Sequence, residues 1–174
     1  MKKVFFIIPT LGDGGAERVM LTILSSLNRD EVKPILILFE KRGEYLDALP
    51  SDVEIRVVGT RKGIFRLRGL VSFGVIKKLS KLIKDEVPDV LVSFMWFTNA
   101  LTIIAKKISG ATCKVISSER YGLKLSYEGW FTESQRKAVI RFLYPAANII
   151  VVNAREMGEH LKDMNQMPPE KLEV

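Results

Sequence analysis

The chain has 174 residues, 47% hydrophobic and 27% charged, a composition typical of one soluble globular domain and not of a disordered or fibrous protein. Its single cysteine, Cys113, excludes a disulfide framework and a multi-cysteine metal site, and its single histidine, His160, excludes a histidine-rich metal centre. The 27 basic and 20 acidic residues leave a formal net charge of +7, which favours an anionic partner such as a nucleotide, a diphosphate or a phospholipid surface.

Apolar runs and helical periodicities alternate along the whole chain. In chain order they predict a strand over 4–8, a helix over 15–27, a strand over 34–39, a short helix over 44–49, a strand over 53–58, a helix over 70–84, a strand over 89–94, a helix over 99–109, a strand over 114–118, a helix over 130–143, a strand over 148–152 and a last helix through 157–164. In the long helix we expect Phe73 to point inward, and Thr98 is expected to cap the helix that Gly110 ends.

This alternation predicts an α/β fold: a doubly wound, Rossmann-like parallel sheet with helices on both faces. Residues 168–174 look like a turn leading into another strand, so we expect the chain to be a piece of a longer protein. In such sheets ligands bind beyond the carboxyl ends of the strands. The loops to inspect are therefore 9–15, 94–98, 118–128 and 153–155.

The first of these loops connects a strand to the helix that follows it and contains two adjacent glycines, Gly14 and Gly15. Without side chains, they let backbone N–H groups approach an anion at the helix N-terminus, although a tight turn would also need glycine. Thr10 lies in the same loop. Glu17 and Arg18 follow in the first helical turn, where a carboxylate also suits the helix dipole and an arginine can be a plain surface charge.

Two nucleotide-binding motifs can be tested on this loop. The dinucleotide fingerprint G-x-G-x-x-G begins at Gly12, but its third glycine is replaced by Glu17. Glu40, after the second strand, could still bind a ribose, so an NAD-dependent oxidoreductase domain remains an alternative. The P-loop motif fails at the same position.

Two later loops also carry candidate ligand-binding side chains. Trp96 follows the fourth predicted strand. An aromatic ring there can form the floor of a ligand cleft or be part of the core under the next helix. Glu119 and Arg120 follow the fifth strand side by side. Together they could bind a sugar or a phosphate or supply a base, and the alternative is a local ion pair.

Residues 61–84 hold eight basic residues and no acidic one. Apolar residues lie between the charges, a pattern typical of a segment that contacts an anionic membrane surface, although an ordinary amphipathic helix with a solvated lysine face would look the same. The basic residues assigned to this surface are Arg66, Arg68, Lys77, Lys78, Lys81 and Lys84. A stand-alone membrane-binding module is therefore a second alternative. No nucleic-acid-binding motif is present, so no nucleic-acid partner is expected.

Several segments, taken together, resemble a known family. Residues 6–11 followed by Gly-Gly-Ala-Glu-Arg-Val over 14–19 resemble the opening of family 4 glycosyltransferases, and four later segments agree in order. These segments are 88–94, 116–120, 145–153 and 169–174. The resemblance spans the chain and implies the N-terminal domain of a GT-B fold, the fold of retaining enzymes that use a nucleotide-sugar.

The resemblance implies that residues 1–174 are the acceptor-binding domain, that a second domain absent from this chain holds most of the nucleotide-sugar site, and that this domain alone is inactive. Gly14 and Gly15 would offer backbone N–H groups to the donor diphosphate, and Glu119 and Arg120 would line the acceptor side. Many relatives carry a histidine at or beside Arg120. Transfer in this family needs neither a cofactor nor a metal, and the sequence contains no Asp-x-Asp pair. The expected acceptor is a glycan or a lipid-linked sugar, reached by a cytoplasmic protein at the inner face of the membrane.

Overall fold

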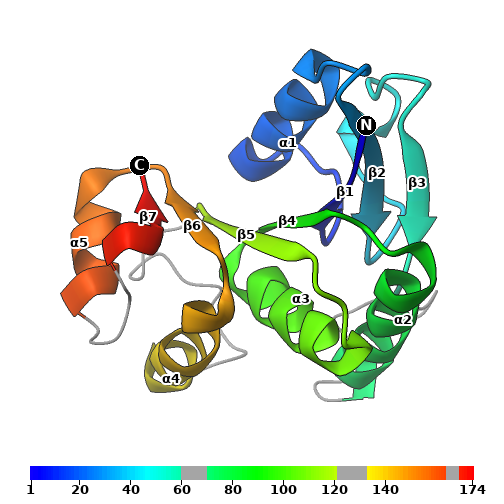
Figure 1. The fold of residues 1–174 in the computed structure, drawn as a ribbon. Coiled ribbons are helices and arrows are strands. Elements are labelled where there is room, and N and C mark those ends of the chain that lie inside the picture. The colour runs from blue at the N-terminus through cyan, green and yellow to red at the C-terminus, as the bar shows by residue number, and fades with distance from the viewer. Residues whose placement is uncertain (60–69, 121–132, 164–168) are drawn as a thin grey trace.

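A computed structural model describes residues 1–59, 70–120, 133–163 and 169–174 (Figure 1). The strands are β1 (Lys2–Ile8), β2 (Val32–Leu38), β3 (Glu54–Val57), β4 (Val90–Phe94), β5 (Lys114–Glu119), β6 (Ile149–Val152) and β7 (Leu172–Glu173). The helices are α1 (Gly15–Ser26), α2 (Leu70–Glu86), α3 (Trp96–Ser109), α4 (Glu133–Leu143) and α5 (Arg155–Asp163), with 3₁₀ turns η1 (Glu44–Leu46), η2 (Tyr144–Ala146) and η3 (Pro169–Lys171).

The strands form one parallel sheet in the order β3-β2-β1-β4-β5-β6-β7. From β1 the chain first builds outward through β2 and β3, then returns to the other side of β1 and builds outward again from β4. The strand order therefore reverses between β1 and β4, and their carboxyl ends form the switch point where ligands bind in such sheets. The predicted doubly wound, Rossmann-like fold is confirmed.

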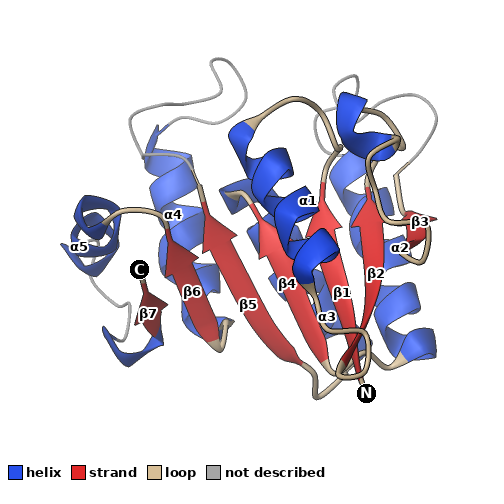
Figure 2. Cartoon of the chain, turned by 90° about the horizontal axis from the view of Figure 1, so that it is seen from above, coloured by secondary structure: helices blue, strands red, loops and turns tan. Residues whose placement is uncertain are grey.

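The two faces of the sheet carry separate hydrophobic cores. On β1, Phe5 and Ile7 point into the core shared with α2, α3 and α4, whereas Phe6 and Ile8 point into the core covered by α1. This alternation follows from the two-residue period of a strand. Figure 2 shows α1 in front of the sheet and α2, α3 and α4 behind it. Among the described helices, α1 lies over this face and leaves the part of the sheet around β5 and β6 without a helix in front of it.

Helix α1 is held to the sheet by an apolar stripe. Ala16, Met20 and Leu24 recur at i, i+4 and i+8 and are buried, with Met20 and Leu24 fully so. Removing the Leu24 side chain beyond Cβ would cost about 2–5 kcal/mol of stability, as is usual for a buried leucine. The stripe thus fixes the orientation of α1 and the position of its first turn.

Two local predictions are wrong. Helix α3 begins at Trp96, so Thr98 lies inside the helix, fully buried, and the residue before the helix is Met95, whose side chain makes no capping bond. Phe73 is 68% exposed, because the inward stripe of α2 runs through Val75, Leu79 and Ile83. Phe73 lies six positions before Leu79, off the face that this i, i+4 spacing sets.

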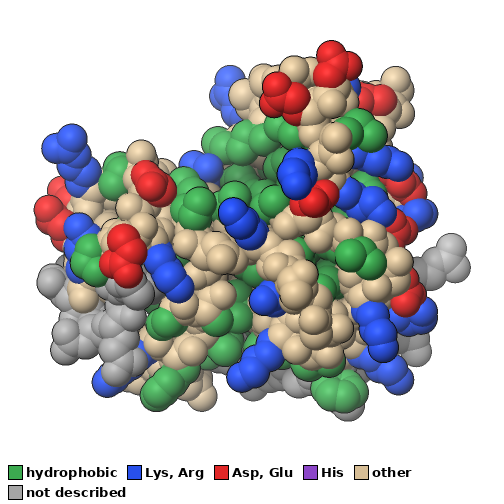
Figure 3. Space-filling model, viewed as in Figure 1, with side chains coloured by type: hydrophobic (Ala, Val, Ile, Leu, Met, Phe, Trp, Pro, Cys, Tyr) green, Lys and Arg blue, Asp and Glu red, His purple; other side chains and the backbone are tan. Residues whose placement is uncertain are grey.

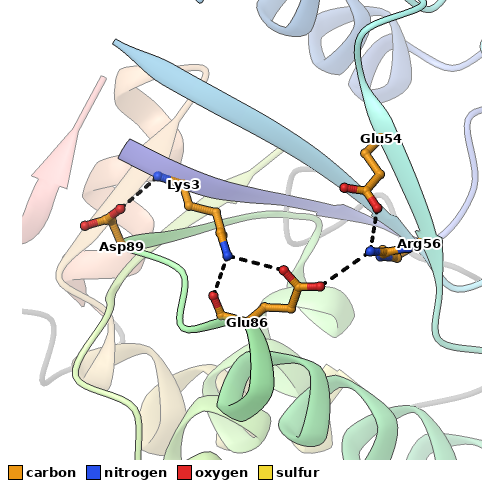
Figure 4. A network of polar contacts seen from close by, with 5 residues as sticks. All are labelled: Lys3, Glu54, Arg56, Glu86 and Asp89. Atoms are coloured by element: carbon orange, nitrogen blue, oxygen red, sulfur yellow. Dashed lines mark hydrogen bonds and ion pairs between the residues drawn. The ribbon is translucent and has the colours of Figure 1, made fainter. Parts of the chain in front are cut away.

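At the amino edge of the sheet, charged residues from several elements are paired with one another (Figure 4). The Lys3 Nζ donates to the backbone oxygen of Glu86 at 2.7 Å and lies 3.3 Å from its carboxylate. Arg56 contacts Glu86 at 3.5 Å and Glu54 at 2.5 Å. The backbone N–H of Lys3 donates to Asp89 at 2.8 Å. These contacts join β1 and β3 to the end of α2 and to the residue that precedes β4.

Candidate functional site

We call residues 9–15 the glycine loop. It ends at the first turn of α1, as predicted. Figures 1 and 2 agree in placing this turn close to the carboxyl ends of β4 and β5. Gly14 is the residue before the helix and makes no side-chain cap, so the first backbone N–H groups of α1 are not occupied by a capping side chain. Gly15 is exposed, and a Cβ atom built on it would meet no described atom within 4 Å. The approach to the helix N-terminus is therefore open at Gly15.

The side chains of Glu17 and Arg18, in the same turn, differ in position: Glu17 folds over the turn and Arg18 is exposed. A Cβ atom on Gly14 would lie 2.3 Å from Glu17 Oε2, so the Glu17 carboxylate folds back over Gly14. A carboxylate in the first turn favours the positive end of the helix dipole, which agrees with the stabilising interpretation of Glu17. Arg18 is exposed, and its backbone N–H donates to Gly14 O at 3.0 Å.

The glycine loop rests on the segment that follows β2. Pro9 O accepts hydrogen bonds from the backbone N–H groups of Phe39 and Glu40, and Leu11 exchanges backbone bonds with Arg42 and Tyr45. This pairing holds the loop on both sides of Thr10, which is half-buried.

Gly43 makes this pairing possible and was not singled out from the sequence. Its φ is +136°, and a Cβ atom there would lie 1.9 Å from Leu11 O. Only glycine fits such a position without backbone displacement. Within the sequence, Gly43 looks like one of several loop glycines, so only the three-dimensional contact with Leu11 identifies it.

The carboxyl end of β4 passes into α3 through one residue, Met95, whose φ of +73° is unusual for a residue with a side chain. Trp96 and Phe97 begin the helix with their ring centroids 5.6 Å apart in an edge-to-face arrangement. Both rings pack against the core on the α3 side and remain partly exposed. Trp96 thus packs as the core interpretation expects, and its role at a ligand cleft stays a prediction.

Glu119 and Arg120, neighbours in sequence, lie on opposite faces of the sheet. The Glu119 carboxylate contacts Tyr144, which belongs to the core on the α3 and α4 side. The Arg120 guanidinium lies over the ring of Phe94, which belongs to the α1 side, with its carbon 5.0 Å from the ring centroid. The pair is thus not one cluster at a cleft edge, because the strand alternation separates the two side chains.

Glu119 is buried within a chain of polar side chains. It is 1% exposed, and Tyr144 Oη donates to its Oε2 at 2.7 Å. Asn99 Nδ2 donates to Tyr144 Oη at 3.0 Å, and Ser93 Oγ donates to Asn99 Oδ1 at 2.8 Å. We call Ser93, Asn99, Tyr144 and Glu119 the buried relay. A buried carboxylate needs such partners, because burial of a charge without them is costly.

The sequence analysis missed the first three residues of the buried relay. They come from β4, α3 and η2, and Tyr144 lies 45 residues from its partner Asn99. No local spacing connects them. A polar Asn99 inside an apolar helical segment is the one sequence signal that could have indicated a buried polar contact.

Arg120 has the opposite environment. Its side chain is partly buried, and its Nε atom has no hydrogen-bond partner among the described residues. Burial alone lowers the pKa of Arg120, although the side chain stays a cation at every physiological pH. A desolvated guanidinium with a vacant donor is suited to an anionic or strongly polar ligand.

A hollow lies on the side of the sheet that α1 covers, the same side as Arg120. The space-filling view shows the surface dipping between α1 and the β7–α5 end of the molecule, with hydrophobic and basic side chains along it (Figure 3). Ile116 and Ile149 are paired in register and point to this side of the sheet, where Ile116 is partly exposed and Ile149 is exposed. Among the described elements, this part of β5 and β6 therefore offers a partly apolar surface on the same face of the sheet as Arg120.

Glu40, considered above as a ribose ligand, and Asp52 both have partners of their own. Glu40 forms an ion pair with Arg42 at 3.6 Å. Asp52, at the amino end of β3, pairs with Arg29, which lowers the pKa of Asp52 chiefly through the side-chain hydrogen bond. Within the described ranges, no three His, Cys, Asp or Glu side chains gather where they could hold a metal ion.

On α2, Lys77, Lys78, Lys81 and Lys84 are all exposed. Lys78 donates to Gly59 O at 3.1 Å and Lys81 pairs with Asp85, one turn later. Arg66 and Arg68 lie outside the described residues. None of the described helices combines the length and the hydrophobicity that crossing a bilayer requires.

A parallel sheet of this order, with a glycine loop opening onto a helix N-terminus at the switch point, defines a Rossmann-like domain of the kind that makes up each half of a GT-B enzyme. The family model "Glycosyltransferase Family 4" matches residues 13–174, and the chain belongs to this family. The resemblance inferred from the sequence is confirmed.

Individual relatives agree with this assignment. The chain is 30% identical over 131 residues to a Campylobacter jejuni enzyme described as GalNAc-α-(1→4)-GalNAc-α-(1→3)-diNAcBac-PP-undecaprenol α-1,4-N-acetyl-D-galactosaminyltransferase, a match that covers 75% of this chain and 36% of that enzyme. Among solved structures, the apo lipopolysaccharide outer core galactosyltransferase WaaB superposes with a TM-score of 0.74 at 13% identity, covering 100% of this chain and 45% of that one. Anabaena HepE in complex with UDP and glucose gives 0.71 at 15% identity, covering 100% and 44%. The chain thus spans less than half the length of these relatives.

Proposed function

We propose that this chain is the acceptor-side domain of a two-domain glycosyltransferase that transfers a hexose-type sugar from a nucleotide-sugar to a glycan or lipid-linked acceptor. The observation that carries the proposal is the open first turn of α1 at Gly15, located at the switch point of a chain that belongs to family 4. Backbone N–H groups of a helix N-terminus stabilise anions. Here they would contact the donor diphosphate from across a cleft that a second domain completes.

Departure of the nucleoside diphosphate is the step that such a site assists. The bond from the sugar to the diphosphate breaks while the acceptor hydroxyl forms the new glycosidic bond. Negative charge develops on the leaving diphosphate oxygen, which takes up the proton of that hydroxyl. Fixed N–H dipoles and cations stabilise that charge more in the transition state than in the ground state. Gly14 and Gly15 supply the dipoles and Arg120 supplies a cation on the same side of the sheet. We further propose that the reaction retains the anomeric configuration and uses no metal ion.

The acceptor would occupy the hollow on the α1 side of β5 and β6. Its partly apolar floor suits a sugar ring or the beginning of a lipid chain. The relative from Campylobacter jejuni is named for an undecaprenyl-diphosphate-linked acceptor. A lipid-linked acceptor would also give the exposed lysines of α2 a role, since they would hold the enzyme at an anionic membrane surface.

The experiment compares the complete transferase, containing both domains, with residues 1–174 alone. Each protein is incubated with a panel of nucleotide-sugars and undecaprenyl-diphosphate-linked glycans, and product is measured by mass spectrometry. We expect transfer by the complete protein, unaffected by EDTA, with an α-linked product from an α-linked donor by NMR. The chain alone should transfer nothing.

The controls distinguish the parts of the proposal. Failure of every donor and acceptor pair with a correctly folded complete protein would contradict the proposed function. Product of inverted configuration would contradict retention only, and loss of transfer with EDTA that Mg²⁺ restores would contradict metal independence only. Transfer by residues 1–174 would show that no second domain is required.

A further inference from the structure

The hydrogen bonds of the buried relay have a determined direction. Asn99 Nδ2 also donates to the backbone oxygen of Ser118 at 3.1 Å. A backbone carbonyl accepts only, so this contact fixes which end of the Asn99 amide carries the N–H groups. Asn99 therefore donates to Tyr144 Oη as well, and Tyr144 must direct its own proton to Glu119. The Glu119 Oε2 atom is held as an acceptor.

The same contacts clamp the end of β5 on both sides of the Arg120 side chain. Ser118 O accepts from Asn99 and also from the backbone N–H of Met95 at 3.0 Å. Arg120 O accepts from Asn153 Nδ2 at 3.4 Å. Between these two carbonyls, Glu119 is tied through Tyr144 to η2. The start of α3, η2 and the residue after β6 thus fix the backbone that carries Arg120.

The burial of Glu119 determines how it can act. Its side chain is 1% exposed and lies on the α3 and α4 side, whereas the glycine loop, Arg120 and the hollow lie on the α1 side. A group in this position reaches a ligand on the α1 side only through its neighbour in the chain. Arg120, in contrast, is partly exposed and has an Nε without an acceptor in the described part of the molecule.

We propose that Glu119 and Tyr144 are positioning residues that act through Arg120, and that Arg120 is the residue that contacts an anionic group of the substrate. This inference rests on the proposed function and refines it, because the resemblance implied that both Glu119 and Arg120 line the acceptor side. The carboxylate of Glu119 serves as a hydrogen-bond acceptor and not as a base.

The rival role for Glu119, direct contact with substrate, makes a different prediction for its amide variant. In Glu119→Gln the Oε1 of the new amide can still accept the Tyr144 hydrogen bond, while the negative charge is lost. A positioning role is rescued by this variant and a base is not. Glu119→Ala removes both functions and serves as the reference.

The experiment measures kcat and KM of the complete transferase for these variants and for Tyr144→Phe, alone and combined with Arg120→Ala. Tyr144→Phe removes one hydroxyl from a fully buried ring. We expect it to lower kcat/KM about tenfold, since small misplacements of a binding group have effects of this size. In the Arg120→Ala background the same change should lower kcat/KM less than about twofold, because residues that act as a unit are not additive. Glu119→Gln should keep kcat within about threefold of the parent, and Glu119→Ala should lose at least about tenfold. Tyr45→Phe, which removes a hydroxyl from η1, is the matched control and should change nothing.

Three results would overturn the inference. An equal loss from Tyr144→Phe in both backgrounds would show that the hydroxyl only stabilises the fold, a conclusion that an equal fall in thermal midpoint would accompany. Glu119→Gln as inactive as Glu119→Ala, at an unchanged midpoint, would show that the carboxylate itself takes part in the chemistry. Arg120→Ala that transfers at the parental rate would be a third such result, because Arg120 would then not contact the substrate. Failure of the proposed function looks different, because the parent protein would then transfer no sugar to any acceptor.

Discussion

The amino edge and the carboxyl edge of the sheet differ in how their charged side chains are paired within the protein. At the amino edge, Lys3, Glu86 and Arg56 neutralise one another across β1, α2 and β3. At the carboxyl edge, Arg120 Nε and Glu17 Oε2 are buried without a hydrogen-bond partner in the described ranges. The paired charges of the amino edge stabilise the fold. In the function proposed above, the carboxyl edge offers the Arg120 cation and the N-terminus of α1 to the ligand.

The glycines show the same difference. Gly43 is required by the fold, because its φ is +136° and its Cβ position is filled by Leu11 O. Gly15 is not required by the fold, because its Cβ position is empty. We infer that Gly43 shapes the glycine loop and that Gly15 leaves room for what binds to it.

The largest expected effect is on stability and comes from a substitution that disrupts the support of the glycine loop. Gly43→Ala should lower the free energy of unfolding by about 3 kcal/mol or more, because the added Cβ forces the backbone of residue 43 or of Leu11 to move. Urea denaturation of the complete protein measures this. Gly15→Ala is the matched control and should be neutral or slightly stabilising, since alanine favours a helix over glycine. Equal midpoints for the two variants would contradict the distinction.

The next prediction compares one substitution at each edge: the one at the carboxyl edge should lower activity, and the one at the amino edge should lower stability. Arg120→Ala should lower transfer about a hundredfold, the size found for removing one donor to a developing negative charge, with little change in stability. Glu86→Gln should do the reverse. It leaves transfer unchanged and lowers stability by about 1 kcal/mol, since it weakens a half-buried ion pair. Loss of transfer in Glu86→Gln at an unchanged unfolding midpoint would show that the amino edge also serves catalysis.

A third prediction concerns the basic face of α2. Lys78 and Lys81 have partners in the protein, so the exposed Lys77 and Lys84 should contribute most to binding of an anionic membrane. Replacing both with Gln should weaken binding to phosphatidylglycerol vesicles by about 2 kcal/mol, or about thirtyfold. Lys33→Gln with Lys114→Gln removes the same charge elsewhere and should have a smaller effect. Equal losses for the two pairs in vesicle sedimentation would show that net charge and not this helix face determines binding.

The smallest expected effect is on the acid stability of the amino edge. The backbone hydrogen bond from Lys3, helped by Lys2, lowers the pKa of Asp89. A carboxyl whose pKa is lower in the folded state contributes stability above its unfolded pKa of about 3.9, and this contribution is lost as the pH falls below that value. Asp89→Asn should therefore show a shallower loss of stability between neutral pH and pH 3. Parallel curves for the variant and the parent would contradict the assignment.

The sequence predicted what depends on local pattern. The strands, the start of α1 at Gly15 and the end of α3 at Gly110 all follow from residues close together in the chain. The errors at Thr98 and Phe73 concern which turn or face a pattern selects, and packing decides that. The separation of Glu119 from Arg120 could have been expected from strand alternation once β5 was known to extend to Glu119.

The buried relay was beyond local pattern. Its residues come from β4, α3, β5 and η2, and the contact of Tyr144 with Glu119 spans 25 residues. The same holds for Gly43, whose importance lies in a backbone atom of another loop. Chemistry that is assembled from distant segments is visible only after the fold places them together.

The most direct test of the central claim is the transfer rate of Gly15→Trp compared with Gly74→Trp in the complete transferase. Both glycines are in helices, and a Cβ atom on either would meet no described atom within 4 Å, but Gly74 is on α2, behind the sheet. Both variants should therefore fold, with thermal midpoints close to the parent. If the first turn of α1 binds the donor diphosphate, Gly15→Trp should lose at least about a hundredfold in rate and Gly74→Trp almost none. Full transfer by a folded Gly15→Trp variant would contradict the account.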